Sequence, residues 1–210
     1  MVVIHIGGLN AIQMDFLREL ENIGAGNAAT ALANMLDRQI GLNVPNACFC
    51  DFSKMHEVLG GAEQLVTGSL VEMCGDLRGA ILFVQTLKDS RKLSKALLYT
   101  MGVEESDEPE FPSEMQRSAL MEIANILCGA YVNAIASLTD LYINCSVPGF
   151  TIDMAGAMMN LPAAMYGTFG DTVLLLETIF VDHDEYISGH FFLIPDIESH
   201  DLLMQKMGIA

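Results

Sequence analysis

Two pairs of polar side chains stand out because an acid and an amide lie three residues apart in each. The pairs are Glu19 with Asn22 and Glu122 with Asn125. Residues three apart on a helix point to the same side, so each pair presents a carboxylate and a carboxamide together. A carboxamide can orient an attacking water, as a glutamine does in GTP hydrolysis. A carboxylate can pair with a lysine of a partner protein and fix the docking geometry.

The two pairs belong to an internal repeat of the chain. Sliding the sequence by 103 residues lays residues 15–45 over residues 118–148 without a gap, and 11 of the 31 paired positions are identical. In each copy a proline follows the asparagine after 22 intervening residues. A single Glu-x-x-Asn is most simply a local cap or a hydrogen-bonded pair inside the fold. The same pair at the same place in two copies favours a shared functional demand.

One stretch imitates a nucleotide-binding turn. Residues 24–29, Gly-Ala-Gly-Asn-Ala-Ala, match the glycine fingerprint G-x-G-x-x-A. Such a turn follows a strand and opens a helix. Here the apolar spacing of Leu17, Leu20 and Ile23 places the glycines inside a helix already under way. We therefore expect no nucleotide site at this stretch.

The glycines are expected to leave a ridge without side chains, against which a sheet, a second helix or a docked partner comes close. The second copy retains Gly26, as Gly129, but replaces Gly24 by Leu127. Gly26 is therefore expected to serve internal packing. Gly24 is expected to mark a difference between the two sites.

The charge balance restricts the partners of this chain. Among its 210 residues, 27 acidic against 10 basic side chains give a formal net charge of −17. Such a surface repels nucleic acid and anionic membranes and favours a partner that exposes lysine or arginine. The acidic surface also serves to keep soluble a chain of which 51% is hydrophobic.

No other motif points to catalysis or metal binding: the sequence has no H-E-x-x-H, no Walker lysine loop and no recognisable Ser-His-Asp arrangement. Cys48 and Cys50 are separated by one residue, not by the two of a zinc or redox knuckle. The histidines are expected to be ordinary surface or core residues: His5, His56, His183, His190 and His200. The cysteines are expected to be buried and reduced, which suits the cytoplasm: Cys48, Cys50, Cys74, Cys128 and Cys145.

Residues 118–138 form an apolar stretch about as long as a membrane span. Glu122, Asn125 and Asn133 interrupt it, and a carboxylate and two amides in hydrocarbon would be unfavourable. We interpret this stretch as a largely buried helix of a soluble protein. The N-terminus has no basic segment followed by a cleavage site, so no signal peptide is expected.

The spacing of apolar residues predicts the same order of elements in both copies. The first copy is expected to hold a helix over 11–37 with Asn10 as N-cap, an extended segment over 40–51, strands over 65–73 and 79–87, and a helix over 91–101. The second is expected to hold a helix over 114–140, an extended segment through Pro148, a short helix or loop near 153–165, strands over 172–181 and 186–194, and a helix over 199–207. The two repeats, about 10–102 and 113–208, are joined by an acidic linker over 103–112.

Both copies match a longer pattern, [DS]-x3-E-x2-N-x22-P, which runs from Asp15 to Pro45 and from Ser118 to Pro148. This is the signature of the CheC/CheX/FliY family of chemotaxis phosphatases, which the chain resembles over nearly its whole length. The tandem copies, the length and the segment N-I-G-A-G-N-A-A-T are most similar to the CheC type. Two motifs exclude the single-motif CheX architecture, and FliY is not expected because no flagellar-switch domain follows Ala210.

The resemblance implies hydrolysis of the phospho-aspartate on the response regulator CheY. By motif position, Asn22 and Asn125 would orient the attacking water, and Glu19 and Glu122 would engage the regulator's active-site lysine. Mg²⁺ would remain a ligand of the regulator, so no cofactor of the chain's own is expected. The other motif residues would support the helix start, the contact surface or the fold: Asp15, Ser118, Pro45 and Pro148.

The resemblance also implies an α/β (α+β) fold, a single domain over 1–210 with a pseudo-two-fold axis and long motif helices packed on a β-sheet. The receptor deamidase CheD is implied as a second partner. Positions beside the motifs differ, Arg18 against Met121 and Glu21 against Ala124, so the sites are expected to differ in affinity or rate while both are competent. The alternative function is a non-enzymatic adaptor that binds CheD or phosphorylated CheY.

Overall fold

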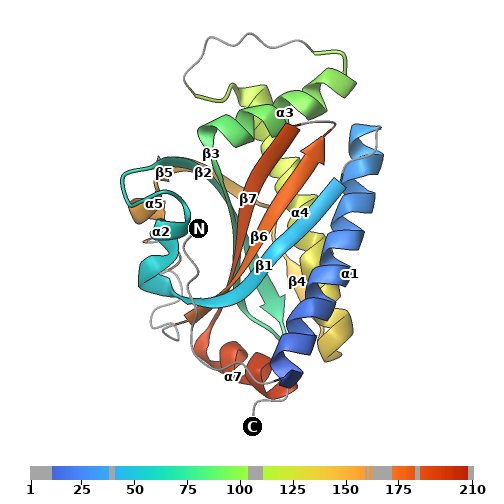
Figure 1. Ribbon diagram of the computed structural model, residues 1–210, viewed down its shortest axis with the longest axis vertical. Coiled ribbons are helices and arrows are strands. Elements are labelled where there is room, and N and C mark those ends of the chain that lie inside the picture. Colours follow the sequence, from blue (N-terminus) through green and yellow to red (C-terminus); the bar gives the residue numbers. More distant parts are fainter. Residues whose placement is uncertain are drawn as a thin grey trace.

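The computed structural model describes residues 11–37, 41–103, 111–158, 160, 162, 172–182 and 185–207. Its helices are α1 (Ala11–Leu36), the short 3-10 helix η1 (Phe52–Lys54), α2 (Met55–Val58), α3 (Leu87–Thr100), α4 (Glu114–Thr139), α5 (Ala155–Met158) and α7 (Ile197–Lys206). Its strands are β1 (Gly41–Asp51), β2 (Leu65–Gly75), β3 (Gly79–Thr86), β4 (Ile143–Cys145), β5 (Gly149–Met154), β6 (Thr172–Asp182) and β7 (Glu185–Pro195). This order confirms the expected long helices, strands and final helices in both copies, whereas η1, α2 and β5 were not predicted (Figure 1).

Two helices begin earlier than their apolar spacing predicts. α3 begins at Leu87 rather than Arg91, because Thr86 is its N-cap and accepts a hydrogen bond from the backbone N–H of Asp89. α7 likewise begins ahead of its predicted start, behind the N-cap Asp196. Capping residues lie before the first apolar residue of a helix, so apolar periodicity alone misses them. The predicted cap Asn10 and most of the predicted linker lie outside the described residues.

The strands form one antiparallel sheet in which each half of the chain completes the other. The order is β1-β6-β7-β3-β2-β4, and β5 also pairs with β2. Strand β1 of the first half pairs with β6 of the second, whereas β4 and β5 of the second half pair with β2 of the first. The two halves meet at the central pair of β3 and β7. This arrangement has the expected pseudo-two-fold symmetry.

The motif prolines lie at equivalent breaks in the outer strands. Pairing of β1 with β6 shifts its register between Asn43 and Asn46, on either side of Pro45. In the second half, Pro148 lies between β4 and β5, which pair with different parts of β2. Proline lacks the N–H that a ladder requires, so a break or bulge at this position follows from the residue itself.

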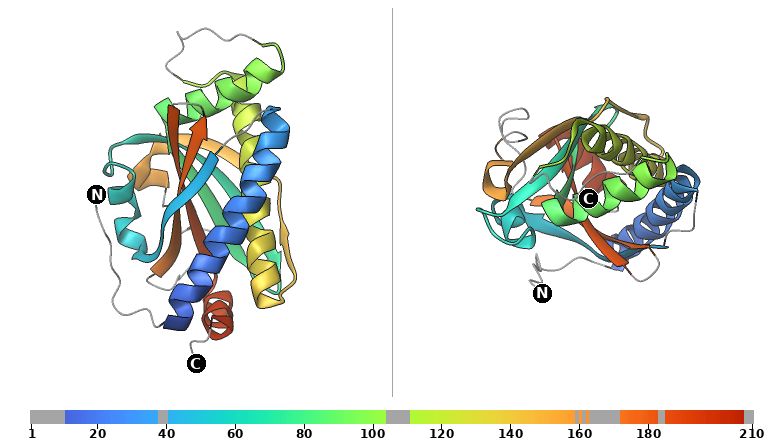
Figure 2. Two further views of the ribbon diagram at one scale, coloured as in Figure 1. Left: turned by 45° about the vertical axis from the view of Figure 1, so that its right-hand side comes forward. Right: turned by 90° about the horizontal axis from the view of Figure 1, so that it is seen from above.

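Both faces of the sheet are covered, and each face has its own hydrophobic core. Helices α1 and α4 lie side by side on one face, and the short helices α2 and α5 lie on the other (Figures 1 and 2). Neighbouring residues of β6 divide between the two cores: Leu174 and Leu176 pack towards α1 and α4, and Leu175 packs towards α2 and α5. Burial on both faces explains why the central strands are almost continuously apolar.

Helix α4 is an interior element of this fold. Its N-terminus is closed by a capping box in which Ser113 and Gln116 satisfy each other's backbone N–H groups. By length and composition α4 could span a bilayer, but 61% of its most apolar window is buried inside the protein. After α1 and α4, Asp37 and Asp140 adopt left-handed backbone angles, with φ of 48° and 55°. The repeat therefore keeps its aspartate where the chain turns out of each long helix.

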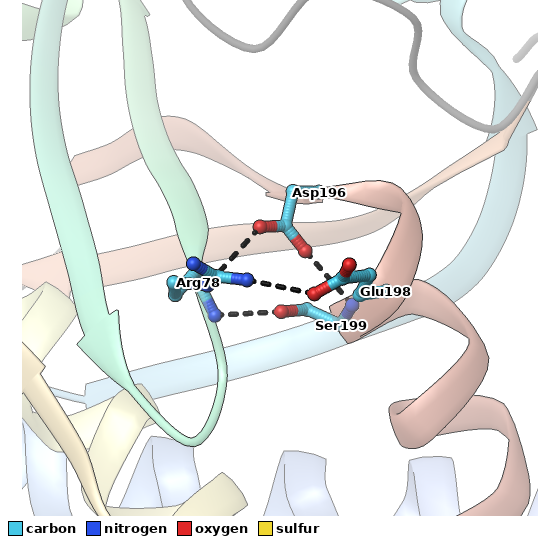
Figure 3. A network of polar contacts seen from close by, with 4 residues as sticks. All are labelled: Arg78, Asp196, Glu198 and Ser199. Carbon is cyan, nitrogen blue, oxygen red and sulfur yellow. Dashed lines mark hydrogen bonds and ion pairs between the residues drawn. The ribbon is translucent and has the colours of Figure 1, made fainter.

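A polar cluster ties the turn between β2 and β3 to the start of α7 (Figure 3). The Nη2 atom of Arg78 donates to Glu198 Oε2 at 2.8 Å, and the Nε atom of Arg78 lies 3.4 Å from Asp196 Oδ2. The backbone N–H of Arg78 donates to Ser199 Oγ at 2.8 Å. These contacts join residues of the first half to the second half at the end opposite α3.

The expectation that the cysteines are buried is wrong for two of them. Cys128 in α4 is buried and Cys48 is half-buried, but Cys74 and Cys145 are exposed. Cys74 lies at the end of β2, where only the short edge strand β4 covers it, and Cys145 lies on β4 itself. Burial raises the pKa of the Cys128 thiol, which keeps that side chain protonated.

Candidate active site

The first Glu–Asn pair lies on the solvent-exposed face of α1. The opposite face is a buried stripe that packs on the sheet and α4, with residues at helical spacing: Gln13, Leu17, Leu20, Gly24, Ala28, Leu32 and Leu36. This stripe fixes the rotation of the helix, and Glu19 and Asn22 are therefore both exposed. Asp15 is also exposed and lies one turn before Glu19, where its carboxylate is 3.6 Å from the guanidinium of Arg18.

The second pair has the same placement on α4. Leu120, Ile123 and Ala124 are buried, and Glu122 and Asn125 are exposed. α4 is buried over more of its circumference than α1, so its pair is a polar interruption in an otherwise interior helix. The packing of each helix therefore presents one carboxylate and one carboxamide to solvent.

The side chains of the two Glu–Asn pairs make no contacts with the described residues that would hold the fold together. Within the described ranges, none of them makes a hydrogen bond or an ion pair with another residue. A cap or an internal hydrogen-bonding pair would show a bond to a neighbouring backbone or side-chain group. The interpretation of each pair as a local cap or an internal hydrogen-bonding pair is therefore not supported by the geometry.

The two pairs form separate patches. The colours of Figure 1 show that α1 and α4 run in opposite directions. Each pair lies in the N-terminal half of its own helix, so the two pairs lie nearer to opposite ends of the antiparallel helices. The structure thus presents two candidate sites, each with one glutamate and one asparagine.

The surroundings of the second pair include an apolar cavity. Its volume is about 390 Å³, and it is lined by Met35 of α1, the end of α3, and Met115, Ser118, Ala119 and Glu122 of α4. The motif serine and glutamate therefore stand at the border of a hollow with several methionine and leucine side chains. Around Glu19, the neighbouring charges are those of Asp15 and Arg18. Two equal sites are not expected from these different environments.

The expectation that Gly26 serves internal packing is wrong, and it is Gly24 that has this role. A Cβ atom on Gly24 would lie 2.5 Å from Cδ1 of Tyr131, so Gly24 is the residue that allows α1 and α4 to pack closely. A Cβ on Gly26 or on Gly129 would meet nothing within 4 Å. Gly26 lies on the face of α1 that carries Asn22, because the two are four residues apart.

The aromatic ring of Tyr131 connects the helix pair to the sheet. Its hydroxyl lies 3.3 Å from Thr178 Oγ1, and its ring centroid is 4.9 Å from that of Phe191. Burial raises the pKa of Tyr131 to about 12, so the hydroxyl is neutral at physiological pH. Among the described residues, no group of three or more His, Cys, Asp or Glu side chains is placed to hold a metal ion.

Comparisons with known proteins give the class of this fold and motif. The family model described as the CheC-like family matches residues 12–47 and 115–152, the two copies of the repeat. A curated relative from Bacillus subtilis (strain 168), the CheY-P phosphatase CheC, is 34% identical over 205 residues, 97% of each chain. The chain belongs to the CheC-like family, which confirms the resemblance inferred from the doubled signature.

Solved structures share the fold at lower identity. FliY of Thermotoga maritima aligns with a TM-score of 0.72 at 21% identity, covering 96% of this chain and 98% of that one. The FliM middle domain from H. pylori aligns with a TM-score of 0.63 at 10% identity, covering 94% and 99%. A chain from the complex of CheX with CheY, BeF3 and Mg²⁺ from Borrelia burgdorferi aligns with a TM-score of 0.52 at 18% identity, covering 86% of this chain and 97% of that one. These likenesses confirm a mixed helix and sheet fold of this type.

Proposed function

We propose that this protein is a chemotaxis phosphatase that hydrolyses the phospho-aspartate of the response regulator CheY. The observation that carries the proposal is the pair of exposed, unpartnered Glu–Asn motifs at the same place in both repeats. The name of the Bacillus relative and the solved complex of CheX with CheY support the choice of substrate. The protein acts in the cytoplasm, where such a regulator is phosphorylated.

The chemistry assigned to each asparagine is the orientation of a water molecule. The carboxamide of Asn22 or Asn125 holds the water in line with the phosphorus atom without itself gaining or losing a proton. The water oxygen forms a new bond to phosphorus as the bond between phosphorus and the aspartate oxygen breaks. The products are the free carboxylate of the regulator and inorganic phosphate, which carries both protons of the water and then releases one of them to solvent.

The role assigned to each glutamate is docking. The carboxylate of Glu19 or Glu122 pairs with a lysine of the regulator, and this charge-assisted contact sets the orientation of the phosphoryl group towards the asparagine. The net charge of −17 attracts a lysine-bearing surface at longer range. Mg²⁺, which screens the phosphoryl charge, belongs in this proposal to the regulator.

Turnover distinguishes this enzyme from an adaptor. The purified protein, at about one-tenth of the concentration of phosphorylated CheY, is expected to accelerate loss of the phosphoryl group from the whole regulator pool. The measurement is release of inorganic phosphate with time, with and without CheD. Stoichiometric protection of the phosphoryl group would instead assign the protein an adaptor role. CheD stays a predicted partner, and an unchanged rate in its presence would argue against a regulatory role for it here.

A further inference from the structure

Gly26 and Gly129 are retained in both repeats although nothing in the fold requires a glycine there. Each lies one helical turn after the motif asparagine, four residues on from Asn22 or Asn125. Neither has a positive φ, and an added Cβ would meet nothing within 4 Å at either position. Glycine is among the least favourable residues inside a helix and alanine the most favourable. Neither packing nor backbone conformation therefore explains why glycine is present at position 26 or at position 129.

The geometry of a helix connects this position to the asparagine. Helical side chains tilt towards the N-terminus, so a residue covers the surface over the turn that precedes it. A side chain at position 26 would therefore lie over Asn22, and one at position 129 would lie over Asn125. With glycine at both positions, the flank of each carboxamide is left uncovered.

The substrate of the proposed function gives this bare surface a purpose. An aspartate side chain is short, so its phosphoryl group can reach a carboxamide on a helix only if the partner's backbone comes close to that helix. Glycine is the residue that permits such close approach of another backbone. Gly24 is not an alternative candidate, because it is buried against Tyr131.

We propose that Gly26 and Gly129 are positioning residues of the two sites, which admit the backbone around the phospho-aspartate to contact distance of each motif helix. This inference rests on the proposed phosphatase function and adds to it a steric requirement on the residue one turn after each asparagine. A larger side chain there hinders docking of the regulator and leaves the fold intact.

The test is a graded pair of double variants in the full chain, Gly26→Ala/Gly129→Ala and Gly26→Leu/Gly129→Leu. KM for phosphorylated CheY is expected to rise about threefold to tenfold with alanine and about 100-fold with leucine, with a smaller change in kcat. Affinity for CheY loaded with BeF3 and Mg²⁺ is expected to fall in parallel. Melting temperature is expected to rise by about 2–4 °C per alanine, because helix propensity improves without a clash.

The matched control is Asn34→Leu/Ser137→Leu, which adds the same side chain at equivalent exposed positions about two helical turns beyond Gly26 and Gly129. This control is expected to keep the wild-type KM. Wild-type KM and affinity in the glycine-to-leucine variant, or a lower melting temperature with alanine, would overturn the inference. The Asn22→Ala/Asn125→Ala variant separates the two claims: if it is inactive the proposed function stands whatever the glycines do, and if it is fully active the proposed function itself fails.

Discussion

The motif glutamates and asparagines of the two long helices are exposed side chains without internal partners in the part of the chain that the structure describes. In the same helices, buried polar groups are bonded within the chain: Gln116 closes the capping box of α4, and Thr139 donates to the carbonyl of Ile135 at 2.7 Å. Glu19, Asn22 and their counterparts have no such contacts within the described ranges. At these positions the chain holds hydrogen-bonding capacity available to a partner.

Replacing the glutamates tests their proposed docking role. Glu19→Gln/Glu122→Gln removes two negative charges and keeps the shape of each side chain. KM for phosphorylated CheY is expected to rise about tenfold, because a charge-assisted contact contributes roughly 1.5 kcal/mol. The rise is expected to shrink at high salt, where the wild-type attraction is itself screened. A KM equal to that of the wild type at low salt would contradict the docking role.

Glycine-to-alanine substitutions two residues apart are expected to have opposite effects on stability. Gly24→Ala brings a methyl group against Tyr131 and is expected to lower the free energy of unfolding by about 1–3 kcal/mol. Gly26→Ala meets open space and is expected to raise it by up to about 1 kcal/mol. Denaturant titration of the two variants measures both. Equal effects of the two substitutions would contradict the described packing of α1 on α4.

At the scale of elements, the helices could be predicted from the sequence more fully than the sheet. The spacing of Leu17, Leu20 and Leu32 defines the buried face of α1, and Gly24 belongs to the same stripe. Membership of this buried stripe is the sequence signal that assigns Gly24 to helix packing. Retention of Gly26 in the second copy suggested, wrongly, that Gly26 has the packing role. Strand exchange between the halves could not be predicted, because apolar runs identify strands but do not specify their distant partners.

His190 on β7 makes the stability of the sheet depend on pH. Burial lowers its pKa to about 4, an effect that Asp89 partly opposes, and Glu177 lies directly opposite it on β6. The folded protein therefore binds fewer protons than the unfolded chain between pH 6.5 and 4. The stabilising contribution is present above pH 6.5 and is lost as the pH falls through that window.

His190→Gln is expected to remove this part of the pH dependence. Between pH 7 and pH 5, the wild type is expected to lose about 2 kcal/mol more unfolding free energy than the variant. Parallel denaturant titrations at the two pH values measure the difference, and the many carboxylates contribute equally to both proteins. An identical pH dependence in the two proteins would show that His190 is not desolvated as described.

At the scale of the whole molecule, the duplication places one candidate site on the long helix of each half, and strands of both halves build the sheet beneath these helices. β1 pairs with β6, and β4 and β5 pair with β2, so each half supplies an outer strand to the other. The doubled motif predicted the family from sequence alone, because both copies share one spacing, and the site role of its four residues stays a prediction. The apolar cavity beside Glu122 could not be predicted, since it depends on how α1, α3 and α4 meet.

The central claim, two competent sites that each depend on one asparagine, is tested most directly by the decay of phosphorylated CheY with three variants. Asn22→Ala and Asn125→Ala are each expected to leave partial activity, in unequal amounts because their surroundings differ. The double variant is expected to lose about 100-fold or more in kcat/KM. Asn34→Ala, which replaces an exposed asparagine of α1 about three helical turns beyond Asn22, is the matched control and is expected to be fully active. Loss of all activity in one single variant would contradict the two-site account, and full activity in the double variant would contradict the assignment of the asparagines.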